Sequence, residues 1–304
     1  MVNPSLNWKS LIRDGLFLVM AEALGITRVA MFHGWDPKME RHLRSLWGRV
    51  LFRPFKRANH VIVLSSSFRR ELRALGVKSP IHILCTAIDA ATEQAARCSC
   101  SSGSDRGKRA EPGSRLLFIS RIVRAKGVFT CLEALDLLEE RLPDVSLVIA
   151  GDGPDLPEVN AWLREHPRAR VALAGDVRGA EKVSVMAGCD TLVLPTTYGE
   201  GMPIVVLEGL ALGLTPVVTA VAGLQDMRDH GLPIVVLPNS GQEALASAVL
   251  ELFSAENHRR SLAERGRVAA LKYFTPSAVA TLLDRVLCLA LEGANEEVEW
   301  WLEG

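Results

Sequence analysis

The sequence predicts an α/β protein with parallel sheets built from βαβ units. Short apolar runs bounded by turn residues alternate with helix-period patterns along most of its 304 residues. Such alternation is typical of parallel sheets, because a helix usually connects two parallel strands. One stretch, 92–114, replaces the apolar periodicity with Ser, Gly and charged residues. It indicates a linker, so the sequence predicts two α/β domains.

The first predicted domain covers residues 1–91 and the second covers 115–275. Apolar runs predict the strands of the first domain at 28–32, 60–64 and 81–85. In the second domain, strands are predicted at 115–120, 146–151, 170–175, 191–195 and 215–220, with helices at 127–142, 156–166, 180–188 and 203–213 between them. This order is that of a complete doubly wound sheet with helices on both faces.

The helix predicted at 127–142 shows how the residues lead to these assignments. Val128, Leu132 and Leu135 recur at steps of three and four residues, which places them on one helical face. Acidic residues take several of the other positions. We therefore expect one face of this helix to be buried in the core and the other to be solvated.

The C-terminal part, 276–304, is predicted to be a helix followed by an acidic tail. Two further helices precede it, at 242–253 and 256–272. Thr275 can cap the last helix, and Pro276 suits the first helical position because its missing N–H is not needed there. The tail contains Trp300 and Trp301, for which the sequence predicts no role.

The composition excludes several classes of protein. The 35 Lys and Arg residues balance the 35 Asp and Glu residues, which argues against a nucleic-acid-binding protein. No apolar run approaches the roughly 20 residues that cross a bilayer, and the N-terminus lacks the pattern of a signal peptide. We therefore expect a cytoplasmic location. The six cysteines are expected to be free thiols, and the nearby Cys98 and Cys100 are too few for a structural zinc site.

Charged residues and glycines follow the strands of the second domain where a doubly wound sheet binds its ligands. Arg121 follows the strand at 115–120, and Lys126 stands at the entrance to the next helix. Two cations beside a helix N-terminus would hold a diphosphate, although two solvated surface cations are the plain alternative. Gly151 and Gly153, in GDGPD after the next strand, permit close approach of a ligand or simply a tight turn.

The segment PTTYGEGMPIVVLEGLALG carries two glutamates, Glu200 and Glu208. With a helix beginning near Pro203, their carboxylates would be separated by roughly 10 Å along the axis, about the reach from a ribose across a diphosphate to a sugar. Alternatively, Glu200 complements the helix dipole and Glu208 is a surface residue. Apolar neighbours surround Glu208, which favours a binding role. The residues that would present backbone groups between the two carboxylates are Gly201, Met202, Pro203 and Ile204.

The motifs SRIVRAKG, IAGDGP, GDVRGAEK, VLPTTYGEGMP, LEGLALG and TPVVT occur in this order between 115 and about 285, and together they resemble a family 4 glycosyltransferase of the GT-B fold. The resemblance implies two Rossmann-type domains and transfer of a sugar from a nucleotide sugar with retention of anomeric configuration. It places Glu208 on the ribose, Glu200 on the transferred sugar, and Arg121 and Lys126 on the diphosphate. It implies no metal and no other cofactor.

In the first domain, MFHGWDP resembles the family's strand-end His-Gly, which makes His33 the expected polar residue near the sugar on the acceptor side. His33 and Glu200 are thus the expected catalytic residues. Gly209 and Ala222 depart from the family pattern by small changes. The resemblance also implies that the first strands and helices of a full member, with its glycine-rich loop, precede the point where this sequence begins, so the first domain is expected to be incomplete.

Residues 38–57 are basic, with interleaved aromatic and aliphatic side chains. They could lie on an anionic membrane surface, grip a phosphorylated acceptor, or pack as an ordinary helix with its cations in water. The expected acceptor is a glycan or a lipid-linked glycan. The sequence leaves two alternatives to a glycosyltransferase. One is a noncatalytic remnant that binds a nucleotide or serves as a scaffold. The other is a GT-B-like epimerase, for which the first domain offers no dedicated carboxylates.

Overall fold

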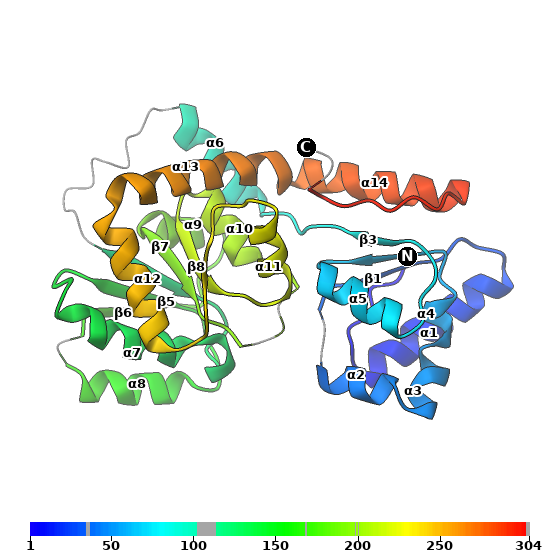
Figure 1. Ribbon diagram of the computed structural model, residues 1–304, viewed down its shortest axis with the longest axis horizontal. Coiled ribbons are helices and arrows are strands. Elements are labelled where there is room, and N and C mark those ends of the chain that lie inside the picture. Colours follow the sequence, from blue (N-terminus) through cyan, green and yellow to red (C-terminus); the bar gives the residue numbers. More distant parts are fainter. Residues whose placement is uncertain (35–36, 102–113, 168, 198, 200, 302–304) are drawn as a thin grey trace.

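The computed structural model describes residues 1–34, 37–101, 114–167, 169–197, 199 and 201–301. They form two α/β lobes that lie side by side, each built on a parallel sheet (Figure 1). Helices α13 (Glu256–Tyr273) and α14 (Pro276–Glu292) run one after the other along the same side of both lobes. This architecture confirms the predicted α/β class with parallel sheets.

The first lobe contains the three predicted strands, β1 (Val29–Phe32), β2 (His60–Val63) and β3 (Ile81–Ile83), paired in that order. All four residues of β2, the central strand of this sheet, are buried. The helices of this lobe are α1 (Trp8–Ala23), α2 (Pro37–Leu43), α3 (Leu46–Leu51), α4 (Arg53–Lys56) and α5 (Ser66–Ala74).

The second lobe has a six-stranded sheet in the order β6-β5-β4-β7-β8-β9, which is the doubly wound order with its reversal between β4 and β7. Its strands are β4 (Arg115–Ile119), β5 (Ser146–Ala150), β6 (Val171–Gly175), β7 (Thr191–Leu194), β8 (Thr215–Thr219) and β9 (Val235–Leu237). Its helices include α7 (Val128–Glu139), α8 (Leu156–Glu165), α9 (Gly179–Ala187), α10 (Ile204–Ala211), α11 (Ala222–Asp229) and α12 (Gln242–Ser254).

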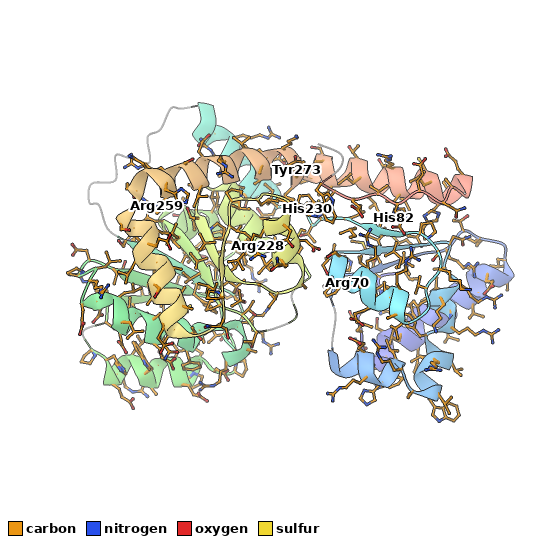
Figure 2. All side chains as sticks on the ribbon, in the orientation of Figure 1. Arg70, His82, Arg228, His230, Arg259 and Tyr273 are labelled. Atoms are coloured by element: carbon orange, nitrogen blue, oxygen red, sulfur yellow. The ribbon has the colours of Figure 1, made fainter. Side chains whose placement is uncertain are left out.

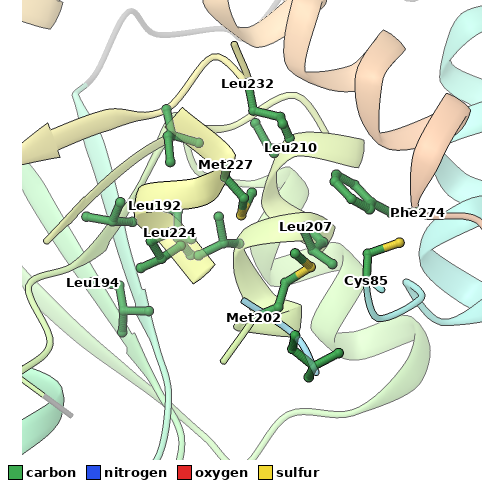
Figure 3. Close-up of a cluster of buried hydrophobic side chains, with 14 of the residues drawn as sticks. Cys85, Leu192, Leu194, Met202, Leu207, Leu210, Leu224, Met227, Leu232 and Phe274 are labelled. Atoms are coloured by element: carbon green, nitrogen blue, oxygen red, sulfur yellow. The ribbon is translucent and has the colours of Figure 1, made fainter. Parts of the chain in front are cut away.

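The core of the second lobe follows from the predicted apolar faces. On α7, Val128, Leu132 and Leu135 are fully buried, as their spacing predicts. Figure 3 shows Leu207 and Leu210 of α10 packed in the same cluster as β7 and α11. The cap of α14 is also as predicted, since the Thr275 hydroxyl accepts a hydrogen bond from the Ala278 N–H at 3.3 Å.

The predicted linker begins with a helix, since Ala90–Ser101 form α6. Asp89 caps this helix by accepting a hydrogen bond from the Thr92 N–H at 2.8 Å, and Glu93 pairs with Arg97 one turn later at 2.8 Å. These local contacts stabilise a helix where apolar periodicity is weak. The rest of the predicted linker up to residue 113 lies outside the described residues.

The acidic tail returns to the first lobe and extends the edge of its sheet. The Ile83 N–H donates to the Val298 carbonyl at 2.9 Å, and the Trp300 N–H donates to the Ile83 carbonyl at 3.0 Å. The Trp300 ring is buried near Tyr273, and Trp301 stacks on His230 with ring centroids 3.7 Å apart. Figure 2 places His230 and Tyr273 where the two lobes meet. Both tryptophans thus fix the tail at the junction of the lobes.

The basic and aromatic segment 38–57 is divided between core and surface. The rings of Phe52 and Phe55 are fully buried beside Phe32 of β1, with centroids 6.1 and 5.8 Å from it. In contrast, Leu46, Trp47 and Val50 on α3 are 81%, 83% and 66% exposed.

Among the described residues, no single helix has the length and apolar character needed to span a membrane, and only the bent pair α13 and α14 would qualify together, on length and composition alone. The described cysteine side chains are free thiols, as predicted: Cys85, Cys98, Cys131, Cys189 and Cys288.

Candidate functional site

A cavity of about 680 Å³ lies at the carboxyl ends of β4, β5 and β6, beside the point where the strand order reverses. Ligands of doubly wound sheets bind at this position because the loops diverge there and leave a crevice. Its polar and charged lining residues are Asp89, Ser120, Arg121, Asp152, Asp176, Lys182 and Glu208.

Glycines bring two loops close enough to form one wall of this cavity. A Cβ added to Gly151 would lie 2.0 Å from the carbonyl oxygen of Ser120, and one added to Gly153 would lie 2.1 Å from that of Ile122. The φ angle of Gly151, +135°, is also one that other residues rarely adopt. The GDGPD loop therefore lies directly on the loop that carries Arg121, as only glycine permits at these two positions.

Glu208 is the buried charged group of the site. It lies on the second turn of α10, which begins at Ile204 with Pro203 as its N-cap, as predicted. Its side chain is 3% exposed, and its Oε1 accepts a hydrogen bond from the Lys182 Nζ at 2.6 Å. The same ammonium group donates to Asp89 Oδ2 at 2.7 Å. Lys182 thus joins α9, α10 and the start of α6 at the cavity.

These contacts determine the protonation of the three groups. Burial raises the pKa of the Glu208 carboxyl above its ordinary value, and the bond from Lys182 acts against that rise. Burial also acts to lower the pKa of Lys182, but its bonds to Asp89 and Glu208 outweigh this effect and the pKa is raised. The pKa of Asp89 is lowered, because its bonds to Lys182 and Thr92 outweigh the effect of burial. Lys182 therefore carries its charge at neutral pH.

The loop before α10 is held between the two lobes. A Cβ on Gly201 would lie 2.6 Å from the carbonyl oxygen of His33 in the first lobe, and one on Gly223 would lie 1.7 Å from the carbonyl oxygen of Gly201. Met202 and Pro203 are buried beside them. The close approach explains why this loop contains a glycine, and it places the predicted acceptor-side histidine next to the predicted donor loop.

A short 3₁₀ helix, η2 (Arg124–Lys126), lies against the end of β7. The Thr197 N–H donates to the Ala125 carbonyl at 2.9 Å, and a Cβ on Gly127 would lie 2.5 Å from the carbonyl oxygen of Pro195. Lys126 directly precedes Gly127, the N-cap of α7, so it stands at a helix entrance as the sequence predicts. It lies close to the strand end that leads into the donor loop.

The structure brings together many of the predicted site residues, but not all in one cavity. Arg121, Gly151, Ile204 and Glu208 line the main cavity. Gly153 lines an adjacent hollow of about 600 Å³ that shares Asp152 with it. His33, Gly201, Met202 and Pro203 belong to the interlobe loop region, and Lys126 stands at the start of α7. The predicted residue Glu200 lies outside the described residues.

Sequence reasoning missed Lys182 and Asp89. Lys182 is the last residue of the motif GDVRGAEK, yet a single lysine in an amphipathic helix resembles a solvated cation. Asp89 follows a strand of the other lobe, and only the folded chain brings it to this site. Among the described residues, no group of three or more His, Cys, Asp and Glu side chains is arranged to hold a metal ion.

Two family models match the chain. The model described as "Glycosyl transferases group 1" matches residues 104–269, which is more than half of the chain. The model described as "Glycosyltransferase Family 4" matches residues 8–92. Together they cover both lobes.

Several curated proteins are similar in sequence. The putative teichuronic acid biosynthesis glycosyltransferase TuaC of Bacillus subtilis is 28% identical over 77% of this chain and 57% of its own length. The alpha-D-kanosaminyltransferase of Streptomyces kanamyceticus is 30% identical over 54% of this chain and 42% of its own length. The phosphatidyl-myo-inositol mannosyltransferase of Mycobacterium tuberculosis is 30% identical over 61% of this chain and 50% of its own length. The chain thus spans about half the length of these relatives.

Solved structures share the fold. Anabaena Alr3699/HepE in complex with UDP superposes with a TM-score of 0.75 and 16% identity, covering 94% of this chain and 78% of that one. Its complex with UDP-glucose superposes with a TM-score of 0.71 and 17% identity, covering 92% of this chain and 76% of that one. Sucrose-phosphate synthase from Thermosynechococcus elongatus superposes with a TM-score of 0.66 and 19% identity, covering 92% of this chain and 73% of that one. These likenesses confirm the expected two-lobed GT-B fold.

Proposed function

The chain belongs to the group 1 glycosyl transferases, and from this premise we propose that it transfers a sugar from a nucleotide-sugar donor to a glycan or glycolipid acceptor with retention of anomeric configuration. The observation that carries the proposal is the buried Glu208 carboxylate in a cavity at the switch point of the second sheet. A buried carboxylate in a crevice of this kind suits the two hydroxyls of a ribose, because its oxygens accept hydrogen bonds from both.

The donor diphosphate would lie between the ribose and the interlobe loop. We assign its neutralisation to Arg121, which lines the cavity, and to Lys126 at the start of α7. Backbone N–H groups at the start of α10, beginning with Ile204, add a favourable partial positive charge. In this proposal the cations stabilise the leaving diphosphate, and the reaction uses neither a metal ion nor another cofactor.

The transferred sugar would lie where the two lobes meet. We propose that His33 from the first lobe and Glu200 from the donor loop act on it, because the chain before α10 passes directly under the His33 backbone. In this arrangement the second lobe binds the donor and the first lobe presents the acceptor. Closure over the donor loop would exclude water from the reacting centre.

The acceptor is proposed to be a glycan or a lipid-linked glycan, and the first lobe to meet it at an anionic membrane surface. Leu46, Trp47 and Val50 form an exposed apolar group on α3, with the cations Arg49 and Arg53 beside them. Sedimentation with vesicles of phosphatidylglycerol and phosphatidylcholine tests this contact. Sedimentation of the natural protein with the vesicles, and its loss in Trp47→Ala, would support this contact. Equal amounts of the two proteins in the vesicle pellet, or none of either, would contradict it.

Donor turnover tests the proposed reaction directly. The protein is incubated with UDP-, GDP- and ADP-sugars, and the released nucleoside diphosphate is measured, with NMR of the anomeric proton of the product. We expect the nucleoside diphosphate to be released from one donor, and an α-linked donor sugar to give an α-linked product. Glu208→Gln should abolish this release. A protein that binds a donor but never releases the diphosphate, with or without acceptor lipid extracts, would instead be a noncatalytic nucleotide-binding member of the family.

A further inference from the structure

Lys182 occupies a central position in the donor cavity. It projects from α9, and its Nζ lies 2.6 Å from Glu208 Oε1 and 2.7 Å from Asp89 Oδ2. The lysine side chain is 15% exposed, so its charge is largely withdrawn from solvent and depends on these two carboxylates. The contact with Glu208 is not an ordinary surface ion pair, because the Glu208 side chain is 3% exposed, whereas the Asp89 side chain is 42% exposed.

We propose that Lys182 is a positioning residue for the donor: its ammonium group holds the Glu208 carboxylate where it accepts hydrogen bonds from the ribose, an inference that rests on the nucleotide-sugar site proposed above. A carboxylate in an apolar helix such as α10 is unfavourable without a cation or several donors. Lys182 supplies the cation from the neighbouring helix and fixes the orientation of the carboxyl group through Oε1.

Asp89 holds the lysine in turn. It caps α6 through Oδ1, which accepts from the Thr92 N–H at 2.8 Å, and it accepts from Lys182 through Oδ2. Because Asp89 follows β3 of the first lobe, it connects the donor cavity to the chain that crosses between the lobes. Lys182 therefore has one fixed anchor, Asp89, and one functional partner, Glu208.

The ionisation of Glu208 makes the role of Lys182 measurable. A protonated carboxyl group would donate one hydrogen bond where the ribose needs an acceptor. Burial raises the pKa of Glu208, and Lys182 opposes this rise. Without Lys182 the carboxyl would take up a proton at a higher pH, and nucleotide affinity would fall there. The other charged groups that line the cavity, and that remain in such a variant, are Asp89, Arg121, Asp152 and Asp176.

Calorimetric titration of UDP, GDP and ADP from about pH 5 to about pH 8 tests the proposal. In Lys182→Met, the pH at which affinity falls is expected to move upward, with binding about tenfold weaker than in the natural protein at about pH 6. Lys182→Arg keeps the cation and should restore most of the low-pH binding. Lys78→Met, which removes an exposed lysine of the first lobe, is the matched control and should change nothing.

Two further variants keep the test decisive. Lys182→Gln retains a hydrogen-bond donor beside both carboxylates and should fold even if Lys182→Met does not; it is expected to show the same upward shift, because it lacks the charge. Glu208→Gln cannot ionise and should therefore lack measurable nucleotide binding at every pH from about 5 to about 8, in agreement with its expected loss of donor turnover. Equal or tighter nucleotide binding in the Lys182 variants, with an unchanged pH profile, would overturn the proposal. Absence of nucleotide binding by the natural protein would overturn the proposed function and this inference together.

Discussion

Ser66 at the start of α5 and Asp226 in α11 join the two lobes through both carboxylate oxygens of the aspartate. The Ser66 N–H donates to Oδ2 and the Ser66 hydroxyl donates to Oδ1, each at 2.5 Å. Asp226 is 6% exposed, so water competes little for these bonds. An N–H group at a helix start has no acceptor within its own helix, and here the other lobe supplies one.

Asp226→Ala should lower the free energy of unfolding by about 2 kcal/mol, because it leaves the Ser66 N–H without its charged acceptor. Asp229→Ala, on the same helix but with a half-exposed side chain, should change it by less than about 0.5 kcal/mol. Urea denaturation of both variants measures the difference. Equal stability of the two would show that the Ser66 contact does not hold the lobes together.

Gly153→Ala should destabilise the protein by about 3 kcal/mol, since the new methyl group would meet the Ile122 carbonyl oxygen at 2.1 Å and the loop would have to shift. Gly34→Ala is the matched control, because an added Cβ there meets no atom within 4 Å. Thermal melts compare the two. We also expect Gly153→Ala to weaken nucleotide binding, since the loop it distorts forms a wall of the donor cavity. A Gly153→Ala protein as stable as the control would contradict the close approach of the two loops.

Stability should fall as pH is lowered from about 6.5 towards 4, because His82 is buried and neutral. Burial and the neighbouring His60 lower the pKa of His82 to about 4. The unfolded chain therefore binds a proton in this window that the folded chain does not, which favours unfolding by up to about 3 kcal/mol at the acid end. The Nδ1 of His82 accepts the Val298 N–H at 3.0 Å, so the tail should detach as His82 becomes protonated.

Urea denaturation at several pH values checks this slope. His82→Gln should flatten the dependence between about pH 6.5 and 4 relative to the natural protein, whereas His258→Gln, on the surface of α13, should retain it. The same slope in the natural protein and in His82→Gln would show that His82 is not the titrating group.

The central strands were predictable because a strand that is buried on both faces is a continuous apolar run in the sequence. β4, β5, β7 and β8 followed directly from such runs. β9 was missed because it is three residues long and two of them are only half-buried. The short helix α11 was missed as well, since its polar residues Gln225 and Asp229 obscure a narrow apolar face.

That Arg121, Gly151 and Glu208 line one cavity was predictable, because each lies in a motif within one strand–loop–helix unit; their roles stay predictions. The site was not predictable where distant segments meet. Asp89 reaches the cavity through the crossing between lobes, and Trp300 is buried only because the tail pairs with β3. Contacts of this kind depend on tertiary packing, which leaves no local periodicity in the sequence.

The most direct test of the account is the thermal stability of the protein with UDP, GDP, ADP and their sugar conjugates, compared with Glu208→Gln and with Glu133→Gln on the exposed face of α7 as control. A ligand at about one hundred times its dissociation constant adds about 2.7 kcal/mol to the folded state. We predict a clear rise in melting temperature with one nucleotide family, retained in Glu133→Gln and abolished in Glu208→Gln. No rise with any nucleotide, or an equal rise in all three proteins, would contradict the assignment of the Glu208 cavity as the donor site.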